Sequence, residues 1–146
     1  MEIVRATMSE LDDVAILFDE YRQFYGNKSD VSSGKAFLQL RLALNESIIF
    51  LAVHEGKAIG FTQLYPTFSS LALQRAFILN DLYVTEDARG LGAGKDLTEM
   101  VFQYSQQQHA RYVTLQTAPD NVNARGLYEK LGMKQDEYCN YVKYFD

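Results

Sequence analysis

A glycine-rich stretch carries the residues whose type and spacing point most directly to chemistry. Residues 89–95 read Arg-Gly-Leu-Gly-Ala-Gly-Lys, and they follow an apolar run, residues 77–84, that is typical of a buried strand. Glycine at every second position allows backbone conformations that a side chain would forbid. The amide groups of such a turn, and of the helix that starts behind it, have no acceptor inside the helix and attract negative charge. The stretch therefore predicts a binding site for a phosphate or pyrophosphate group.

Spacing separates this turn from two other phosphate-binding loops. A Walker-type loop places four residues between its first glycine and a Gly-Lys pair, whereas here Gly90 and Gly94 are one residue too close and Asp96 follows Lys95. The dinucleotide fingerprint Gly-x-Gly-x-x-Gly fails as well, because the glycines occupy alternate positions. Arg-x-x-Gly-x-Gly after a strand that ends in Leu-Tyr-Val and a four-residue polar connection does fit, and it resembles the acetyl-CoA pyrophosphate loop of the GNAT superfamily of N-acetyltransferases. An ordinary tight turn between a strand and a helix is the alternative.

A second motif lies one predicted helix and one predicted strand further along the chain. Residues 121–133 read Asn-x-x-Ala-x-x-Leu-Tyr-Glu-Lys-Leu-Gly-Met, which is similar to the second GNAT signature, an Asn before a short helix that carries Leu-Tyr and ends in Gly. Two motifs in this order identify the chain as a GNAT member by resemblance. Residues 79–84 also resemble the diamine and polyamine acetyltransferase branch, whose members carry two acidic residues there, although Asn80 replaces one of them.

The resemblance implies which residues bind the coenzyme. Asn121 would hydrogen-bond the pantetheine arm, and main-chain atoms at the end of the central strand and in the glycine loop would hold the rest of acetyl-CoA, namely those of Leu82, Tyr83, Val84, Arg89, Gly90, Leu91, Gly92, Ala93, Gly94 and Lys95. Tyr128 occupies the position that protonates the leaving thiolate, which a hydroxyl with an ordinary pKa of ~10 can do. The alternatives are a core tyrosine at Tyr128, a plain helix cap at Asn121 and a solvated side chain at Lys95.

The general base is harder to assign. An ammonium substrate must lose a proton before it attacks, and relatives often supply Glu or His on the central strand, where this chain has Ile78 and Asn80. Asp81 is the adjacent carboxylate, but strict alternation places it on the face opposite Asn80, so a bulge or a water chain would be needed to bring it into play. Tyr21 and Tyr25 are either core aromatics or, with Asn80, the wall of a substrate pocket.

Hydrophobic periodicity predicts about seven strands and about four helices. The resemblance implies that they form an α/β fold with a mixed, mostly antiparallel central sheet flanked by the helices. The first predicted helix is capped by Ser9 and runs to residue 25, and three others cover residues 35–44, 92–109 and 122–131. The polar segment 27–34 is predicted to be a mobile loop. The predicted strands are 3–6, 47–53, 58–65 (ended by Pro66), 73–84, 111–117, 133–135 and 138–145.

Composition limits the class of protein. With 146 residues, we expect one domain, residues 1–146, in the cytoplasm. The formal net charge of −5 argues against a nucleic-acid partner. It also suits a cationic substrate, but such an excess is common among soluble proteins, and that simpler interpretation is preferred. A single cysteine excludes an internal disulfide and a cysteine-based metal cluster, and no apolar run approaches the ~18 residues that a membrane span needs.

These features predict an enzyme that moves an acetyl group from acetyl-CoA, without a metal, to a primary amine. Direct attack in a ternary complex is favoured over an acetyl-enzyme, because Cys139 lies in the last predicted strand. A small amine, polyamine or amino acid is favoured over a protein lysine as the acceptor. The alternative is an acetyl-CoA-binding regulatory module with little or no turnover. The oligomeric state is left open by the sequence. The aromatic tail, residues 138–145, favours pairing with a second copy, and homodimers occur widely in the superfamily that the chain resembles.

Overall fold

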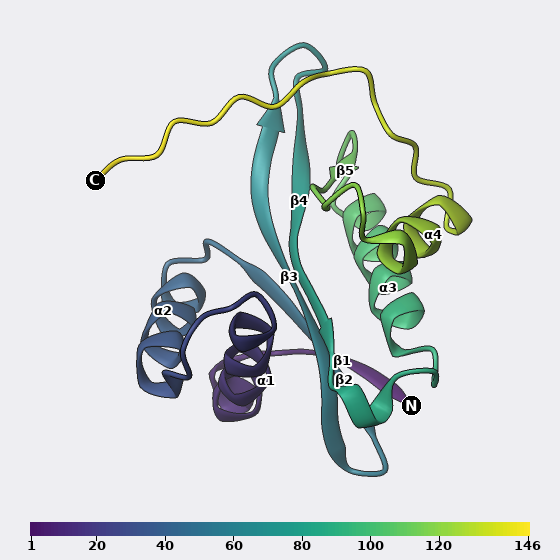
Figure 1. Cartoon of the computed structure of the whole chain (residues 1–146). Helices are drawn as coiled ribbons and strands as arrows, with labels where there is room; N and C mark the ends of the chain where they lie inside the picture. The colour runs from purple at the N-terminus through teal and green to yellow at the C-terminus, as the bar shows by residue number, and fades with distance from the viewer. The chain divides into compact units, whose positions relative to one another are not determined.

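A mixed sheet of five strands forms the centre of residues 1–116 in the computed structural model, which describes all 146 residues of the chain (Figure 1). The order in the sheet follows the order in the chain: β1 (Glu2–Arg5), β2 (Ile48–His54), β3 (Lys57–Ser69), β4 (Gln74–Val84) and β5 (Val113–Thr114). The first four strands pair antiparallel, and β5 pairs parallel to β4. The mixed sheet is as predicted, but the expectation of about seven strands is wrong.

Helices cover both faces of this sheet (Figure 1). On one face lie α1 (Leu11–Phe24), which follows the short 3-10 turn η1 (Met8–Glu10), and α2 (Val31–Ala43). On the other face lies α3 (Ala93–Gln107), which follows η2 (Glu86–Ala88). Each face has its own apolar core, with Phe61 and Leu51 buried toward α1 and Phe77 and Leu64 buried toward α3. None of the helices has the length and apolar character that a membrane crossing requires.

The first helices begin at other residues than predicted. Thr7, and not Ser9, caps the first turn, because its side chain accepts a hydrogen bond from the Ser9 amide. The second helix begins at Val31 and not at residue 35, because the Asp30 side chain caps it by accepting from the Ser33 amide. Part of the loop that we predicted to be mobile is therefore helical.

Strand β3 continues past Pro66, where the sequence predicts its end. Pro66 lies opposite Phe77 of β4, while β2 pairs with β3 only as far as Leu64. The side of β3 that faces β2 is thus an edge at Pro66, and a proline without an N–H group is tolerated there.

Residues 117–146 form a second compact unit, described here by itself. Its helix, α4 (Val122–Lys130), ends as predicted, with Gly132 at a φ of 96° and its amide bonded to the Glu129 carbonyl. No strand follows, so the predicted strands 133–135 and 138–145 are wrong. Alternating side chains favour a strand only where a neighbouring strand supplies backbone hydrogen bonds, and an isolated segment has none to exchange. Four aromatic side chains of this tail are between 84% and 93% exposed, namely Tyr138, Tyr141, Tyr144 and Phe145.

Candidate active site

A bulge in β4 decides which face of the sheet Asp81 occupies. Leu79 pairs with Leu64 and Asp81 pairs with Gln63, so Asn80 is an extra residue without a partner in β3. Leu79 points into the core under α3, whereas Asp81 lies on the α1 face with Gln63. Strict alternation is therefore broken at this point, and the bulge that would bring Asp81 into play is present.

The Asp81 carboxylate is buried, with an exposed fraction of 4%. It accepts hydrogen bonds from Gln63 Nε2 at 2.7 Å and from Asn80 Nδ2 at 3.2 Å, and it is hydrogen-bonded to the Tyr21 hydroxyl. No arginine, lysine or histidine of residues 1–116 forms an ion pair with it. A buried carboxylate is usually paired with a cation, so this one is poised to receive a cationic ligand.

Two tyrosine hydroxyls respond to the negative charge of Asp81. Burial, and then the Asp81 carboxylate, raise the pKa of Tyr65 to about 12. Burial, the charge of Asp81 and the hydrogen bond to it raise the pKa of Tyr21 well above its ordinary value. Both hydroxyls therefore stay protonated at neutral pH and act as hydrogen-bond donors or proton carriers beside the carboxylate.

Gln63 leaves one acceptor in this cluster without a donor. Its side chain is fully buried and its Nε2 donates to Asp81, but its Oε1 has no hydrogen-bond partner. A buried polar atom left unpaired costs about 1–3 kcal/mol. Gln63 and Asp81 thus hold two neighbouring buried acceptors with fewer donors than they can accept, and a primary ammonium has three N–H donors.

Tyr21, Tyr25 and Asn80 were also predicted to line the substrate pocket, and they differ in exposure and in their contact with Asp81. Tyr21 packs its ring against Tyr83 and Tyr25, with centroids 6.3 Å and 5.1 Å away. Tyr25 is 62% exposed and therefore lies at the rim, next to Tyr21. Asn80 is also exposed, and its contact with Asp81 makes it a residue that orients the carboxylate.

The glycine loop has the geometry that an anion site needs. Gly90 and Gly92 have φ values of 89° and 87°, in the left-handed region where glycine is favoured, and an added Cβ would meet no heavy atom within 4 Å at either position. The first intrahelical bond of α3 runs from the Asp96 amide to the Gly92 carbonyl at 3.0 Å, so the amides of the residues between them lack an acceptor within the helix. These features fit the pyrophosphate of acetyl-CoA.

The two cations of this loop differ in how they are held. Arg89 Nε donates to the Val84 carbonyl at 3.1 Å, and its guanidinium lies over the ring of Tyr83, 5.8 Å from the centroid. Lys95 is exposed, and its only ion pair is a long one of 3.9 Å to Glu99. The structure therefore fixes Arg89 against the end of β4 and leaves Lys95 at the surface.

The end of β4 offers an open edge beside this loop. Strand β5 pairs with β4 only at Phe77 and Ile78, although the sequence predicts a strand over residues 111–117. From Leu79 to Val84, no strand of residues 1–116 pairs with this side of β4. No strand of this unit therefore pairs with the main-chain groups of Leu82 to Val84 on this side, although the Val84 carbonyl accepts from Arg89, and their contact with pantetheine stays a prediction.

The two site residues predicted in the second unit lie on α4 and directly before it. Asn121 is the N-cap residue of the helix and its carbonyl accepts from the Arg125 amide at 3.0 Å, but its side chain makes no capping hydrogen bond. Tyr128 is half-buried within the helix. The roles of Asn121 and Tyr128 stay predictions.

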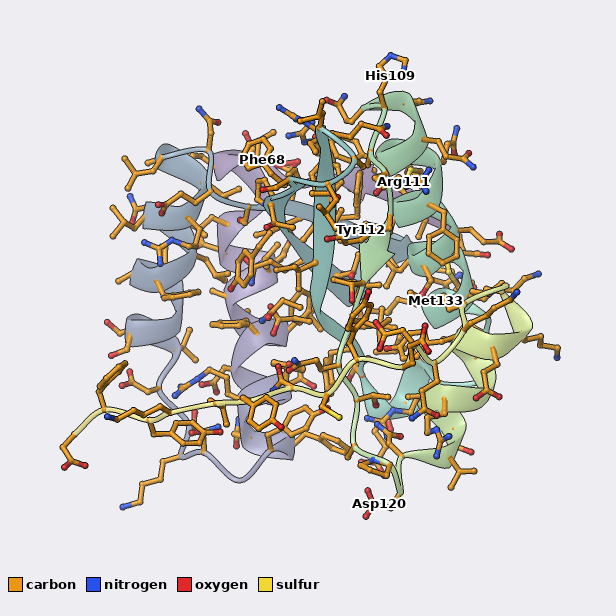
Figure 2. The ribbon with its side chains drawn as sticks, turned by 90° about the horizontal axis from the view of Figure 1, so that it is seen from above. Phe68, His109, Arg111, Tyr112, Asp120 and Met133 are labelled. Atoms are coloured by element: carbon orange, nitrogen blue, oxygen red, sulfur yellow. The ribbon has the colours of Figure 1, made fainter.

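Gln63 and Tyr65 are site residues that the sequence analysis missed. With Phe61 they occupy alternate positions in β3, and a strand over 58–65 places such positions on one face. A glutamine within this otherwise apolar stretch was the available signal. The two histidines contribute nothing to the cluster: His54 ends β2, and His109 is exposed and projects outward from the loop after α3 (Figure 2).

Comparison with known proteins agrees with this geometry. Residues 14–133 match the model of the acetyltransferase (GNAT) family, so the chain belongs to this family and is an N-acetyltransferase with the α/β GNAT fold. GNAT acetyltransferases use acetyl-CoA as the acetyl donor.

Relatives include both sequences and a solved structure. An uncharacterized N-acetyltransferase of Bacillus subtilis (strain 168), YhfO, is 46% identical over 143 residues, which cover 95% of this chain and 96% of that protein. The crystal structure of a probable acetyltransferase is 42% identical, with a TM-score of 0.95 over 100% of this chain and 99% of that chain. The L-2,4-diaminobutyric acid acetyltransferase of Chromohalobacter salexigens is 28% identical over 116 residues, which cover 80% of this chain and 59% of that protein.

Proposed function

We propose that this protein transfers the acetyl group of acetyl-CoA to the primary amine of a small molecule, such as a polyamine or an amino acid. The observation that carries the proposal is the buried Asp81 carboxylate without an ion-pair partner in residues 1–116, next to the unpaired Gln63 Oε1. A primary ammonium supplies the charge and the donors that these two groups lack. The relative that is named a diaminobutyric acid acetyltransferase supports a small acceptor.

The coenzyme side of the site uses the backbone. The glycine loop and the N-terminus of α3 hold the pyrophosphate, and the open edge of β4 from Leu82 to Val84 holds the pantetheine arm. For Asn121 the family resemblance implies a hydrogen bond to the same arm. Acetyl-CoA supplies the thioester when it is bound. A backbone N–H at this edge stabilises the negative charge that develops on the thioester oxygen. Orientation of the amine and the thioester in one ternary complex provides much of the rate enhancement.

Three proton transfers accompany the reaction. The ammonium donates its first proton to the Asp81 carboxylate, with the Tyr21 hydroxyl in hydrogen-bond contact, and the free amine then forms the C–N bond. As the C–S bond breaks, Tyr128 donates a proton to the leaving sulfur, and the second proton that the nitrogen loses on becoming an amide restores the Tyr128 hydroxyl. Asp81 is thus the base and the anchor of the acceptor, and Tyr128 is the acid.

A thiol-release assay with acetyl-CoA tests the proposal. The acceptors are polyamines, diamines, amino acids and a lysine peptide. We expect turnover with a small amine, and Tyr128→Phe should slow product formation while coenzyme affinity stays nearly unchanged. Tyr112→Phe, at an exposed tyrosine of another part of the chain, is the matched control. Turnover with the lysine peptide alone would contradict the small acceptor, and full activity of Tyr128→Phe would contradict its role as the acid.

We also propose that the chain is one GNAT domain that forms a homodimer. The match to the family model, residues 14–133, extends across both compact units. The exposed aromatic side chains of residues 138–145 form an apolar segment that a second copy would cover. Light scattering at micromolar concentration should give the mass of a dimer for the full chain and of a monomer after deletion of residues 137–146. A monomeric full chain would contradict this assembly.

A further inference from the structure

Thr62 is a polar residue in an otherwise apolar layer of the sheet. It pairs with Phe50 of β2 and with Leu82 of β4, and both of these side chains belong to the core under α3 or pack against it. Cross-strand partners lie on the same face, so Thr62 points into that core, where it is fully buried. A hydroxyl in an apolar environment is costly unless it is hydrogen-bonded. Valine has nearly the same shape and would avoid this cost, so the hydroxyl calls for a specific role.

The hydroxyl of Thr62 holds the backbone at the bulge. Thr62 Oγ1 donates to the Asp81 carbonyl oxygen at 2.8 Å, in a buried contact between the neighbouring strands β3 and β4 (Figure 1). Asp81 is the first residue after the unpaired Asn80, so this carbonyl lies where β4 returns to its pairing with β3. A bulge disrupts the ladder locally, and a side-chain donor at this point stabilises the backbone in its bulged conformation.

The next residue of β3 holds the other end of Asp81. Gln63 is fully buried on the α1 face and donates through Nε2 to the Asp81 carboxylate at 2.7 Å. Thr62 and Gln63 therefore hold Asp81 from the two faces of the sheet, one at its carbonyl and one at its carboxylate. Both donors lie on a strand that is paired on both sides, with β2 and with β4, so their positions are fixed by the sheet.

We propose that Thr62 is a positioning residue for acetyl transfer: its hydroxyl fixes the bulge and thereby holds the Asp81 carboxylate on the α1 face, where the carboxylate receives the acceptor ammonium. This inference rests on the proposed function, because it takes Asp81 as the anchor and base of the acceptor. The Thr62 side chain lies on the opposite face, so it acts through Asp81 and not by contact with the acceptor. Without the hydroxyl, the carboxylate is held less precisely, and a misplacement of ~1 Å can cost on the order of 100-fold in rate.

Two comparisons isolate the hydroxyl. Thr62→Val keeps the shape of the side chain and removes the donor, and it is compared with the wild-type protein. Thr62→Ala and Thr62→Ser differ from each other by the hydroxyl alone, and they provide the same comparison if Thr62→Val does not fold. With a small amine and saturating acetyl-CoA, the protein without the hydroxyl should have a kcat/KM on the order of 10- to 100-fold lower in each comparison. The calorimetric affinity for acetyl-CoA should change little, because the glycine loop is separate from this bond.

A second substitution separates positioning from a general loss of packing. Asp81→Asn removes the carboxylate through which Thr62 acts. In that background, Thr62→Val should lower kcat/KM no further, whereas a loss of packing would lower it in both backgrounds. Ser105→Ala is the control, because it removes another buried hydroxyl, one that has no hydrogen-bond partner, and it should leave kcat/KM unchanged. The melting temperature of each variant reports its folding.

The outcomes distinguish this inference from the proposed function. A wild-type kcat/KM in folded Thr62→Val, equal values for Thr62→Ala and Thr62→Ser, or the same loss in the wild-type and Asp81→Asn backgrounds would overturn the role of Thr62 while the proposed function stands. No turnover of any small amine by the wild-type protein would overturn both.

Discussion

Asp81→Asn should lower the pKa of the Tyr65 hydroxyl to a value between two limits. The substitution keeps the shape of the side chain and one acceptor, but removes the negative charge. Burial raises the pKa of Tyr65 most, Asp81 raises it less, and the guanidinium of Arg41 lowers it least. Burial alone therefore outweighs Arg41, so the pKa without the charge of Asp81 should lie above the ordinary 10.0 and below about 12.

The same substitution should remove the counter-charge for the acceptor. A hydrogen bond to a charged group contributes about 1.5–3 kcal/mol, which corresponds to a loss of kcat/KM of roughly 10- to 150-fold. Binding of acetyl-CoA should change little, because the glycine loop is separate from this cluster. The melting temperature should not fall in proportion to the loss of activity, since the variant also removes a buried charge that has no cation beside it.

Two measurements check this prediction. Nuclear magnetic resonance of 13C-labelled tyrosine, followed from pH 8 to pH 12.5, gives the pKa, with Tyr65→Phe to assign the signal. Thiol release gives kcat/KM. Asp13→Asn, at an exposed carboxylate of α1, is the control. A Tyr65 pKa that stays at about 12 in Asp81→Asn, or an unchanged kcat/KM, would refute the cluster as we describe it.

Three further predictions concern stability. Asp19 accepts hydrogen bonds from the Ser29 hydroxyl and the Asp30 amide, both at 2.7 Å, and these bonds lower its pKa below 3.8. Asp19→Asn should thus lower the free energy of unfolding by roughly 2 kcal/mol at pH 7, as measured by chemical denaturation. The difference from the wild-type protein should vanish as the pH falls through the pKa of Asp19 in the folded protein, because the wild-type carboxylate then becomes protonated. Gly60→Ala should lower both the melting temperature and the calorimetric affinity for acetyl-CoA, because an added Cβ would lie 2.9 Å from the Tyr83 carbonyl oxygen in the neighbouring strand. Gly126→Ala, inside α4 and with no heavy atom within 4 Å of the added Cβ, should instead raise stability by up to ~1 kcal/mol in the same denaturation assay.

Features that depend on neighbouring residues in the sequence were predictable. The glycine loop after β4 and the glycine that ends α4 could be predicted because glycine is favoured where the backbone takes a positive φ. The helices could be predicted from the spacing of their apolar residues. Gly92 at a φ of 87° and Gly132 at a φ of 96° are direct examples. The helix starts at Thr7 and Asp30 were missed because several Ser, Thr and Asp residues compete for a cap in each segment.

Features that depend on a partner strand were not predictable. Pro66 was expected to end β3, yet it is tolerated because β2 has already ended, which is a property of the sheet. The strand predicted at 111–117 shortens to Val113–Thr114, and the tail after Gly132 forms none. In each case the side-chain pattern permits a strand, and the presence or absence of a neighbouring backbone decides whether one forms.

In the proposed function β4 binds two ligands, and the bulge at Asn80 explains how it can do so. If β4 alternated strictly, without the bulge, Asp81 would lie on the same face as Leu79, and its carboxylate would enter the apolar core under α3. With it, Leu79 and Leu82 both remain in that core, while Asp81 joins Gln63 and Tyr21 on the other face. This arrangement is what the proposed function requires, with the coenzyme at the open edge of β4 and the acceptor amine on the α1 face. One unpaired residue, Asn80, thus decides which face of the sheet carries Asp81. The proposed acceptor site therefore depends on this backbone bulge more than on the type of any residue in the two sequence motifs.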